Sequence, residues 1–308
     1  ATGITVTGAV NGIPFFSDGT SMYTHDVSGT DDTAQNNTAY GFTALDAITT
    51  GDNNTVIGAV SGGANTGIRN TFIGSLAGDA TAAGQHNVAI GYAALSSDQA
   101  GDFSVAVGSG ALNAQDGGTN GVDFYNVAVG YNAGLSVTTG VNNTLVGGQA
   151  GDSITSAAYN TLFGKSAGGA LTTGGYNTAI GGLALDAEDA HGSNVAVGYA
   201  ALTNLNAGDT IIGGLAGDAL TTGARNTVLG YAALSADTTG QYSVAVGYGT
   251  LANQNFTGGE TSYNTAVGYN AGNDITTGIE NTLIGALAGD AITIGNYNTA
   301  LGYAALST

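Results

Sequence analysis

The sequence predicts an all-β fold, a parallel β-solenoid of about sixteen rungs with about 17 residues each. Three observations predict it. A short unit recurs through most of the chain, each copy holds a β-branched or apolar run that a glycine ends, and no apolar stripe follows the 3.6-residue period of a helix. Short units with one or two strands each stack into solenoids. The alternative, a triangular left-handed helix with turns of about 18 residues, requires a six-residue apolar period that we do not find.

The composition is that of an ordered, glycine-rich chain. Of 308 residues, 54 are glycine, none is cysteine or tryptophan, and 43 % are hydrophobic, which is too high a share for a disordered chain. No run of 18 apolar residues occurs, so we expect no membrane-spanning helix. No basic segment followed by an apolar one opens the chain, so we expect no export signal within it.

The chain is strongly acidic. Its formal net charge is −19, and its only Lys and Arg residues are Arg69, Lys165 and Arg225. Nucleic acids and anionic membranes are bound through many such side chains, so we expect neither as a partner. An acidic surface that keeps the protein soluble is the simplest explanation of the charge.

The repeat is anchored by an Asn, replaced in three copies by Ser or Asp, which we number position zero. Most copies follow one another at the same short interval, and the two long intervals come after Ser104 and Ser243, at matching places in two successive runs of copies. An eight-rung block has therefore been duplicated. We expect residues 1–36 to form an N-terminal strand or docking segment, residues 37–176 the first block and residues 177–308 the second. The sixteen zero positions are Asn37, Asn54, Asn70, Asn87, Ser104, Asn126, Asn143, Asn160, Asn177, Asn194, Asp209, Asn226, Ser243, Asn264, Asn281 and Asn298.

Positions one to four predict a short strand that ends in a turn. Position one is always Thr or Val, position three is always apolar, and position four is always Gly. We predict that position three forms an interface or a core. Besides Tyr40 in the first copy, its residues are Ile57, Ile73, Ile90, Val107, Val129, Val146, Phe163, Ile180, Val197, Ile212, Leu229, Val246, Val267, Ile284 and Leu301.

Positions two and eight compensate for each other in volume. In six copies position two is large and position eight is Gly, whereas seven of the nine copies with Ala at position two have Leu at position eight. Close-packed interiors disfavour both voids and overpacking, so the two side chains should share one space. Two copies are underfilled, Ala128 with Gly134 and Ala266 with Gly272, and the sequence offers no firm reason for them.

The predicted strand is apolar on both faces. Side chains alternate along a strand, so position two faces one way and position three the other. Sixteen stacked apolar side chains left in water would form a larger stripe than a soluble monomer tolerates. We therefore expect another chain to cover one face, and the sequence leaves open which face is internal.

Several copies resemble a known family of repeats. The stretches "NVAIGYAAL" (Asn87–Leu95), "SVAVGSGAL" (Ser104–Leu112) and "NVAVGYAAL" (Asn194–Leu202) are similar to head repeats of trimeric autotransporter adhesins of the YadA type. The wording "NTAxGxxAL…TTG" also resembles repeat regions of phage and bacterial tail-fibre proteins. The resemblance covers residues 37–308 and implies a left-handed β-roll and a homotrimeric fibre. The units here depart from the family in being longer than typical adhesin-head units.

No catalytic site is predicted, and we expect neither an enzyme nor a cofactor or metal. His25, His86 and His191 occupy unlike positions, and the glycines follow the repeat instead of a phosphate-binding motif. Asp recurs at position nine, where stacked carboxylates could bind Ca²⁺. No two of these copies are adjacent, so a solvent-facing turn residue is the simpler explanation. The six residues are Asp46, Asp79, Asp152, Asp186, Asp218 and Asp290.

Three further features are candidates for contacts. The Asn column predicts a ladder of amide hydrogen bonds, with a recognition surface as the alternative. The insertions Asn113–Tyr125 and Ala252–Tyr263 should be loops on one face, where repeat proteins often bind. Tyr at position five could form a sugar-binding stripe or pack at the rung edge. Its residues are Tyr92, Tyr131, Tyr199, Tyr231, Tyr248, Tyr269 and Tyr303.

These observations predict a structural subunit of an extracellular fibre or filament, as in an adhesive surface appendage or a virion fibre. A phage tail or head fibre, or a solenoid that binds a glycan, ice or a surface receptor, is the alternative. Threonine at position one invites ice binding, but five of the sixteen copies carry Val there. The strand-like segment Ala1–Val10 also predicts end-to-end self-association, in which residues 1–36 of one subunit dock on the last rungs of the next by strand addition.

Overall fold

The computed structural model describes residues 33–63, 66–118, 121–186, 190–203 and 208–307, together with the backbone of three short strands before residue 33. These residues form strands, turns and bends, and none of them is helical. The predicted fold class is confirmed, because the chain is all-β and its short, regularly spaced strands form a parallel β-solenoid. The described residues accordingly include no helix that could cross a membrane.

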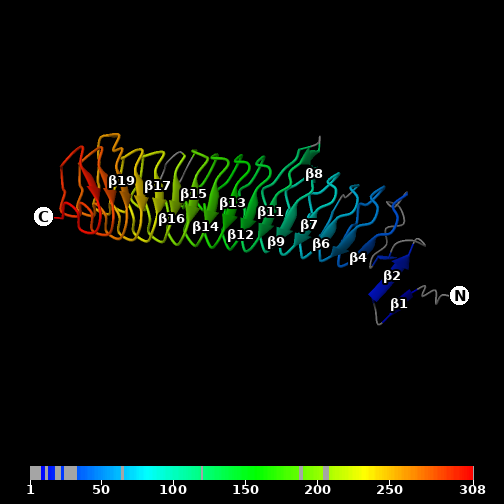
Figure 1. Cartoon of the computed structure of the whole chain (residues 1–308). Coiled ribbons are helices and arrows are strands. Elements are labelled where there is room, and N and C mark those ends of the chain that lie inside the picture. Colours follow the sequence, from blue (N-terminus) through cyan, green and yellow to red (C-terminus); the bar gives the residue numbers. More distant parts are fainter. Residues whose placement is uncertain are drawn as a thin grey trace. The chain divides into compact units, whose positions relative to one another are not determined.

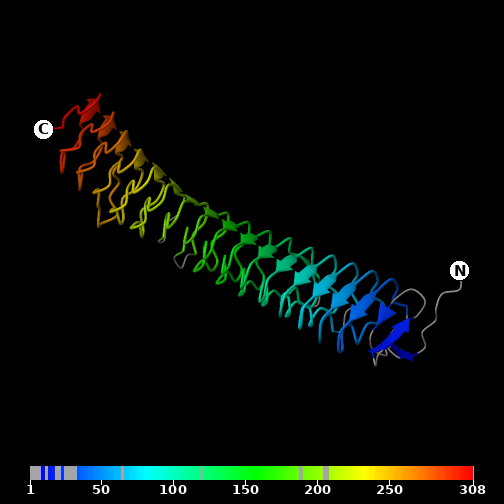
Figure 2. The ribbon, with the colours of Figure 1, turned by 90° about the horizontal axis from the view of Figure 1, so that it is seen from below.

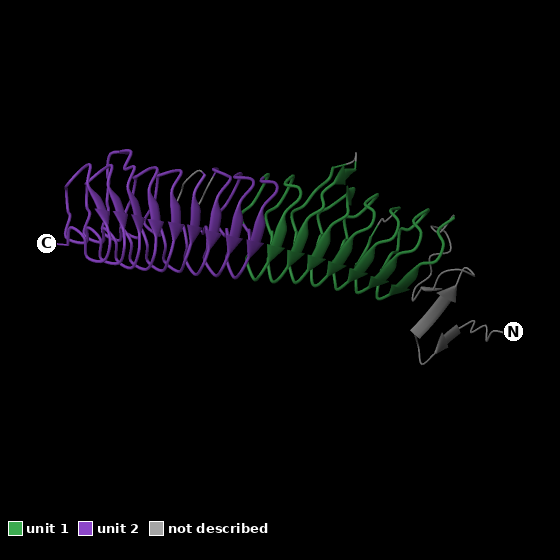
Figure 3. Ribbon diagram, in the orientation of Figure 1, with its two compact units in different colours: residues 1–149, 153–156 green, residues 150–152, 157–308 purple. Residues whose placement is uncertain are grey.

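The chain divides into two compact units (Figure 3). Unit 1 comprises Ala1–Gln149 and Ser153–Ser156, and unit 2 comprises Ala150–Asp152 and Ala157–Thr308. This division does not coincide with the boundary of the sequence duplication at residues 176 and 177.

The strands of unit 1 are β1 (Gly8–Val10), β2 (Ile13–Ser17), β3 (Met22–Tyr23), β4 (Thr38–Tyr40), β5 (Thr55–Ile57), β6 (Thr71–Ile73), β7 (Val88–Ile90), β8 (Gly101–Asp102), β9 (Val105–Val107), β10 (Val122–Asp123), β11 (Val127–Val129) and β12 (Thr144–Val146). Those of unit 2 are β13 (Thr161–Phe163), β14 (Thr178–Ile180), β15 (Val195–Val197), β16 (Thr210–Ile212), β17 (Thr227–Leu229), β18 (Val244–Val246), β19 (Thr265–Val267), β20 (Thr282–Ile284) and β21 (Thr299–Leu301).

Within each unit, every rung contributes one three-residue strand at positions one to three, and these strands pair in parallel without a shift in register. Thr38 pairs with Thr55 in unit 1, for example, and Thr161 pairs with Thr178 in unit 2. The arrows of the three-residue rung strands line one side of the stack in each unit, and the turns line the other side (Figures 1 and 2), whereas β8 and β10 form a separate two-stranded sheet. Equivalent residues of neighbouring rungs therefore lie next to one another, as the repeat predicts.

The turns are built from residues with positive φ at fixed positions. Positions −1, six and eight have φ between 46° and 74° in all sixteen copies. This region costs a residue that has a side chain about 1–2 kcal/mol. Leucine nevertheless occupies it at position eight in half of the copies. Contacts between stacked rungs must therefore offset a local cost that recurs in every rung.

Position four requires glycine for a further reason. Its φ of 121–150° is one that side chains rarely adopt. The neighbouring rung also comes very close, since a Cβ added to Gly91 would lie 2.5 Å from the carbonyl carbon of Gly108. A Cβ on Gly41, Gly164 or Gly285 would overlap the next rung in the same way. The invariant glycine thus follows from how closely the backbones stack.

The core of each rung consists of positions zero, two, seven and eight, which are buried in every rung before the last. Positions two and eight share one space, as their volumes predict. A Cβ added to Gly78 would lie 2.8 Å from three ring carbons of Phe72, and one added to Gly168 would lie 2.7 Å from a methyl group of Leu162. The compensation is therefore a packing constraint within a single chain.

The two underfilled rungs are filled from their neighbours. A Cβ on Gly134 would lie 2.9 Å from a methyl group of Leu112 in the preceding rung, and 2.7 Å from one of Leu145 in the following rung. In unit 2, Gly272 is surrounded in the same way by the leucines of the rungs before and after it. Volume is thus shared between rungs as well as within them, which the single-rung pattern does not reveal.

The N-terminal strands pair with one another and with the first rung. Strand β3 lies parallel to β4, with Met22 opposite Thr38, and β2 and β1 follow in antiparallel pairing. Of the segment Ala1–Val10, only the residues of β1 lie within the described part of the chain. Strand β3 thus adds to the first rung of its own chain. End-to-end self-association stays a prediction.

Candidate interaction surface

The outward side of the stacked strands is largely apolar. Positions one and three are exposed or half-buried in every rung, whereas position two between them is buried. Phe163 and Leu229 at position three, for example, are 57 % and 48 % exposed. Positions two and eight are thus the internal core, and all the predicted position-three residues lie on the outside. We call the two exposed columns, at positions one and three, the apolar strip.

Two more exposed columns flank the strands in sequence, at positions −1 and five, and we call them the border columns. The seven predicted tyrosines at position five are all exposed. Position −1 carries a Tyr or Phe in another seven copies, all exposed, and the sequence analysis missed this column. A count of the residues directly before position zero would have found it. These residues are Phe103, Tyr125, Tyr159, Tyr176, Tyr242, Tyr263 and Tyr297.

In unit 1, side chains at position −1 form a stacked ladder. The Nη1 atom of Arg69 lies 3.4 Å from Nε2 of His86. His86 stacks on Phe103 with ring centroids 5.1 Å apart, and Phe103 stacks on Tyr125 at 5.0 Å. Aromatic pairs of this kind contribute about 0.5–1.5 kcal/mol beyond the area they bury. The ladder therefore helps to offset the positive φ of the residues that form it.

Unit 2 carries the equivalent ladder with different residues. The guanidinium carbon of Arg225 lies 5.4 Å from the ring centroid of Tyr242, and its Nη1 donates a hydrogen bond of 3.1 Å to the Tyr242 hydroxyl. Tyr242 in turn stacks on Tyr263 at 5.3 Å. Elsewhere in the same column, Tyr159 stacks on Tyr176 at 5.0 Å. At matching places in the duplicated block, His86 and Arg225 thus each lie at the end of a stack of two aromatic rings.

A second ladder forms at position five of unit 2. Tyr248 lies between Tyr231 and Tyr269, with ring centroids 5.7 and 5.6 Å away. A sugar ring packs on the face of an aromatic ring, but both faces of Tyr248 are covered by the rings of its neighbours. Packing at the rung edge therefore accounts for Tyr248 better than a sugar-binding stripe does.

The four exposed columns have an unusual charge for this chain. All three Lys and Arg residues lie in the border columns, with Arg69 and Arg225 at position −1 and Lys165 at position five. Of the acidic residues in the repeat, only Glu280 occupies one of the four columns. The apolar strip and its borders are thus nearly free of carboxylates on a chain of net charge −19.

The buried Asn column forms the predicted hydrogen-bond ladder. The side-chain oxygen of Asn70 accepts a hydrogen bond of 2.9 Å from the backbone N–H of Asn87, and its side-chain nitrogen donates one of 2.7 Å to the carbonyl oxygen of Gly84. Asn54 and Asn281 make the same two contacts. Because the column is buried, it holds the rungs together and is not available for recognition.

One member of this column is a carboxylic acid. Asp209 is fully buried, and one of its carboxyl oxygens accepts a hydrogen bond of 2.6 Å from the backbone N–H of Asn226. Its other carboxyl oxygen has no hydrogen-bond partner among the described residues. Burial raises the pKa of Asp209 to about 7, because the charged form loses its hydration.

Each insertion is anchored by a buried glutamine at the point where the ladder has Ser. Gln115 donates hydrogen bonds of 2.7 Å to the Asp98 carboxylate and 3.0 Å to the Ser104 hydroxyl, and it accepts one of 3.0 Å from Asn126. The equivalent residues in unit 2 are Gln254, Asp237, Ser243 and Asn264. The insertions are therefore more than surface loops, because Gln115 and Phe124 in the first and Gln254 and Phe256 in the second are buried.

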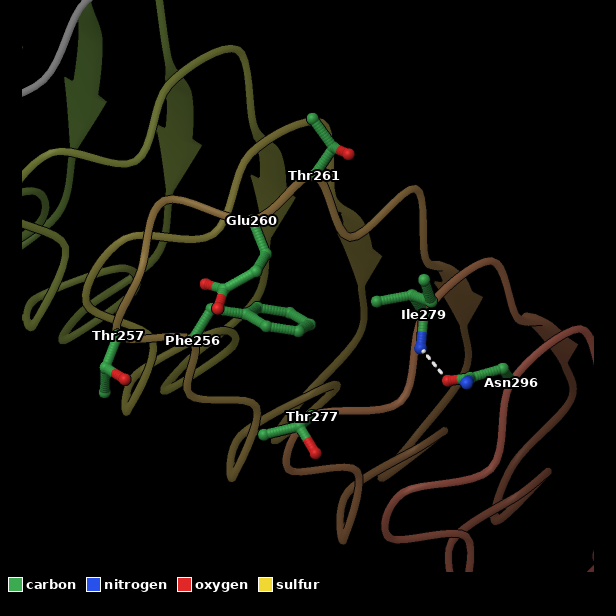
Figure 4. Close-up of a pocket in the computed structure, with 7 residues that line it drawn as sticks. All are labelled: Phe256, Thr257, Glu260, Thr261, Thr277, Ile279 and Asn296. Carbon is green, nitrogen blue, oxygen red and sulfur yellow. Dashed lines mark hydrogen bonds between the residues drawn. The ribbon is translucent and has the colours of Figure 1, made fainter.

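The second insertion borders a shallow pocket of about 420 Å³ in unit 2 (Figure 4). The hydrogen bond within it joins the backbone N–H of Ile279 to Oδ1 of Asn296 at 2.8 Å. Its one carboxylate, Glu260, already accepts a hydrogen bond from the backbone N–H of Gly258. The hollow has a mixed polar and apolar lining without a convergent set of ligands. Its lining residues are Phe256, Thr257, Glu260, Thr261, Thr277, Ile279 and Asn296.

The Asp residues at position nine do not gather into a metal site. Asp46 is exposed and the other five are half-buried, so these five contact solvent over only part of their surface. Burial raises the pKa of Asp79, Asp186 and Asp218. In the part of the chain that the structure describes, no group of three His, Asp or Glu residues is placed to hold a metal ion.

No family model matches the chain, and a comparison with curated proteins finds no relative. The similarity to adhesin-head and tail-fibre repeats therefore remains a resemblance of the repeat unit. Function has to be inferred from the surface itself.

Proposed function

We propose that the chain is a structural subunit of an extracellular fibre or filament, and that its copies pack against one another through the apolar strip as a homotrimer. The observation that carries the proposal is the exposure of positions one and three in both units. Contiguous apolar surfaces of this kind mark interaction sites on soluble proteins. Because the described part of the strip carries no carboxylate, two copies of this acidic chain could meet there without placing like charges against each other.

The strip offers enough apolar surface to drive association. Fully burying a Val, Leu or Ile side chain contributes about 1.5–3 kcal/mol relative to leaving it exposed. The position-three side chains are already partly buried, so covering the whole column would contribute on the order of 10 kcal/mol. That gain is comparable with the cost of the rotational and translational freedom lost on association. Burial of Thr and Val at position one adds to the gain.

A second copy of the same chain is the partner that fits the strip best. Its side chains recur with the spacing of parallel strands, about 4.8 Å. A partner has to match this spacing over many rungs, and another copy does so without adjustment. The border columns, with their tyrosines and cations, would then form the polar and aromatic rim that interfaces commonly have. The number of three copies and the extracellular location rest on the resemblance of the repeats.

The proposal is tested by light scattering coupled to size-exclusion chromatography, with negative-stain electron microscopy of the same fractions. We expect the mass of three chains, or larger filaments, and thin rods in the images. A chain that stays monomeric at micromolar concentration and appears as single solenoids would contradict the proposal.

A further inference from the structure

Unit 2 contains four pairs of tyrosines whose rings stack between neighbouring rungs. Centroid distances are 5.0–5.7 Å and interplanar angles 8–26°. All seven side chains are exposed. The pairs are Tyr159 with Tyr176, Tyr242 with Tyr263, Tyr231 with Tyr248, and Tyr248 with Tyr269.

We propose that these pairs are sites of oxidative cross-linking, at which tyrosines of neighbouring rungs couple to dityrosine. The oxidant is hydrogen peroxide acting through a haem peroxidase. Each phenol gives up one electron and one proton and becomes a phenoxyl radical. The two radicals join through the ring carbons next to the oxygens, and the hydrogens on these carbons move to the oxygens, which restores both phenols. One peroxide takes up two electrons and two protons and leaves as two waters.

The parallel register favours this coupling. Side chains at the same position of paired rungs leave the backbone in the same direction. Because the rings are nearly parallel and their centroids lie 5.0–5.7 Å apart, the carbons beside the two hydroxyls are near one another. Since the rings are exposed, they have room to tilt together as the bond forms. The coupling joins rungs of one chain and does not depend on the proposed assembly.

The composition directs oxidation to tyrosine. The chain has no cysteine, no tryptophan and one methionine, against 15 tyrosines. Phenols are therefore the most abundant readily oxidised side chains, and few other groups compete for the oxidant. Each bond would join two rungs covalently in a protein that lacks disulfides.

The duplicated block supplies internal controls. In unit 1, Phe103 and Tyr125 stack as Tyr242 and Tyr263 do in unit 2, but phenylalanine has no hydroxyl and forms no phenoxyl radical. An isolated tyrosine is also present, because Tyr199 has glycine at position five of the rungs on either side.

The test is oxidation of the dilute full-length chain with peroxidase and hydrogen peroxide. Linked peptides are then mapped by mass spectrometry after cleavage at Lys, Asp and Glu. Lys165 lies between Tyr159 and Tyr176, and Glu260 lies between Tyr242 and Tyr263, so a coupled pair appears as two joined peptides. We expect linked peptides from the stacked pairs and none that join Tyr199 to another residue of the same chain.

Two variants sharpen the test. Tyr176→Phe should lose the peptide linked through Tyr159 and keep the others, and Phe103→Tyr should gain a new link to Tyr125. Links spread over isolated and stacked tyrosines alike would overturn the proposal. So would a wild-type chain without intrachain links, or a Phe103→Tyr chain that gains none while remaining folded by circular dichroism.

Discussion

The ring of Phe72 fills the space that the missing side chain of Gly78 leaves, further along the same rung. A Cβ on Gly78 would lie 2.8 Å from three carbons of that ring. Other rungs reverse the arrangement, with Ala at position two and Leu at position eight, where Leu adopts the same positive φ. The two versions of the rung are therefore two solutions to one packing problem.

This relationship predicts a rescue. Phe72→Ala should destabilise the chain by about 3–5 kcal/mol through the cavity it leaves. Gly78→Leu alone should destabilise it by about 1–3 kcal/mol through overpacking. The double variant converts one version of the rung into the other and should recover most of the loss. Chemical denaturation of the four proteins measures the coupling. A double variant whose losses simply add would show that the two positions do not share a space.

Position four predicts a sharp contrast between two glycines. Gly91→Ala should cost several kcal/mol, because its Cβ would overlap the backbone of Gly108 in the next rung. Gly118→Ala is the matched control, since it also has positive φ but no neighbour within 4 Å of its Cβ. It should cost only about 1–2 kcal/mol. Thermal unfolding followed by circular dichroism distinguishes the two, and equal losses would be inconsistent with the stacking described.

Asp209 predicts a pH-dependent stability. Its pKa is about 7 in the folded chain against 3.8 for an unperturbed Asp, so the folded state favours the protonated carboxyl. The stability that this group contributes is fully present below about pH 4 and is lost as the pH rises through 7. The loss is on the order of 4 kcal/mol by pH 8. Asp209→Asn places the usual ladder residue there and should be more stable than wild type at pH 8.

The control for this prediction is Asp274→Asn, which changes an exposed carboxylate in the same unit. Denaturation midpoints between pH 4 and pH 8 should keep their wild-type dependence in this control and lose the Asp209 contribution in Asp209→Asn. If both variants followed the wild-type curve, Asp209 would not titrate as described.

The glutamine anchors predict that the first insertion depends on one buried side chain. Gln115→Ala leaves the Asp98 carboxylate and the Ser104 hydroxyl each without one of their partners, and it should cost about 1–3 kcal/mol. Amide hydrogen exchange should accelerate in residues 113–118. Gln99→Ala, at an exposed position, is the control and should change neither quantity. Unchanged exchange in Gln115→Ala would mean that the insertion is held by other contacts.

Much of the fold could be predicted because the recurring residues of the repeat are the ones that make the contacts within and between stacked rungs. Asn at position zero, Gly at position four and the trade between positions two and eight each have one structural cause, and the structure shows it. The strip at position three could be recognised as a second apolar face. Its orientation could not, because a period of two residues is the same whichever face is inside.

The rest needed contacts between rungs. The space at Gly134 is filled by Leu112 and Leu145, which belong to the rungs before and after it and are distant from it along the chain. The ladder at position −1 depends on positive φ values, which could not be predicted from the sequence because Tyr and Phe rarely adopt them. From its place in an insertion, Gln115 is predicted to be a loop residue. Its hydrogen bonds to Asp98 and Ser104, which show that it is an anchor, are evident only in the structure.

The central claim is that the apolar strip is where copies of the chain meet. Its most direct test is sedimentation equilibrium of Val129→Asp combined with Val267→Asp, which place a charge on the strip in each unit. Thr139→Asp with Thr277→Asp is the matched control, because it changes exposed turn positions of the same two rungs.

We predict the mass of three chains for wild type and for the control, and the mass of one folded chain for the strip variant. A strip variant that keeps the wild-type mass, or a wild type that sediments as a single chain, would contradict the account.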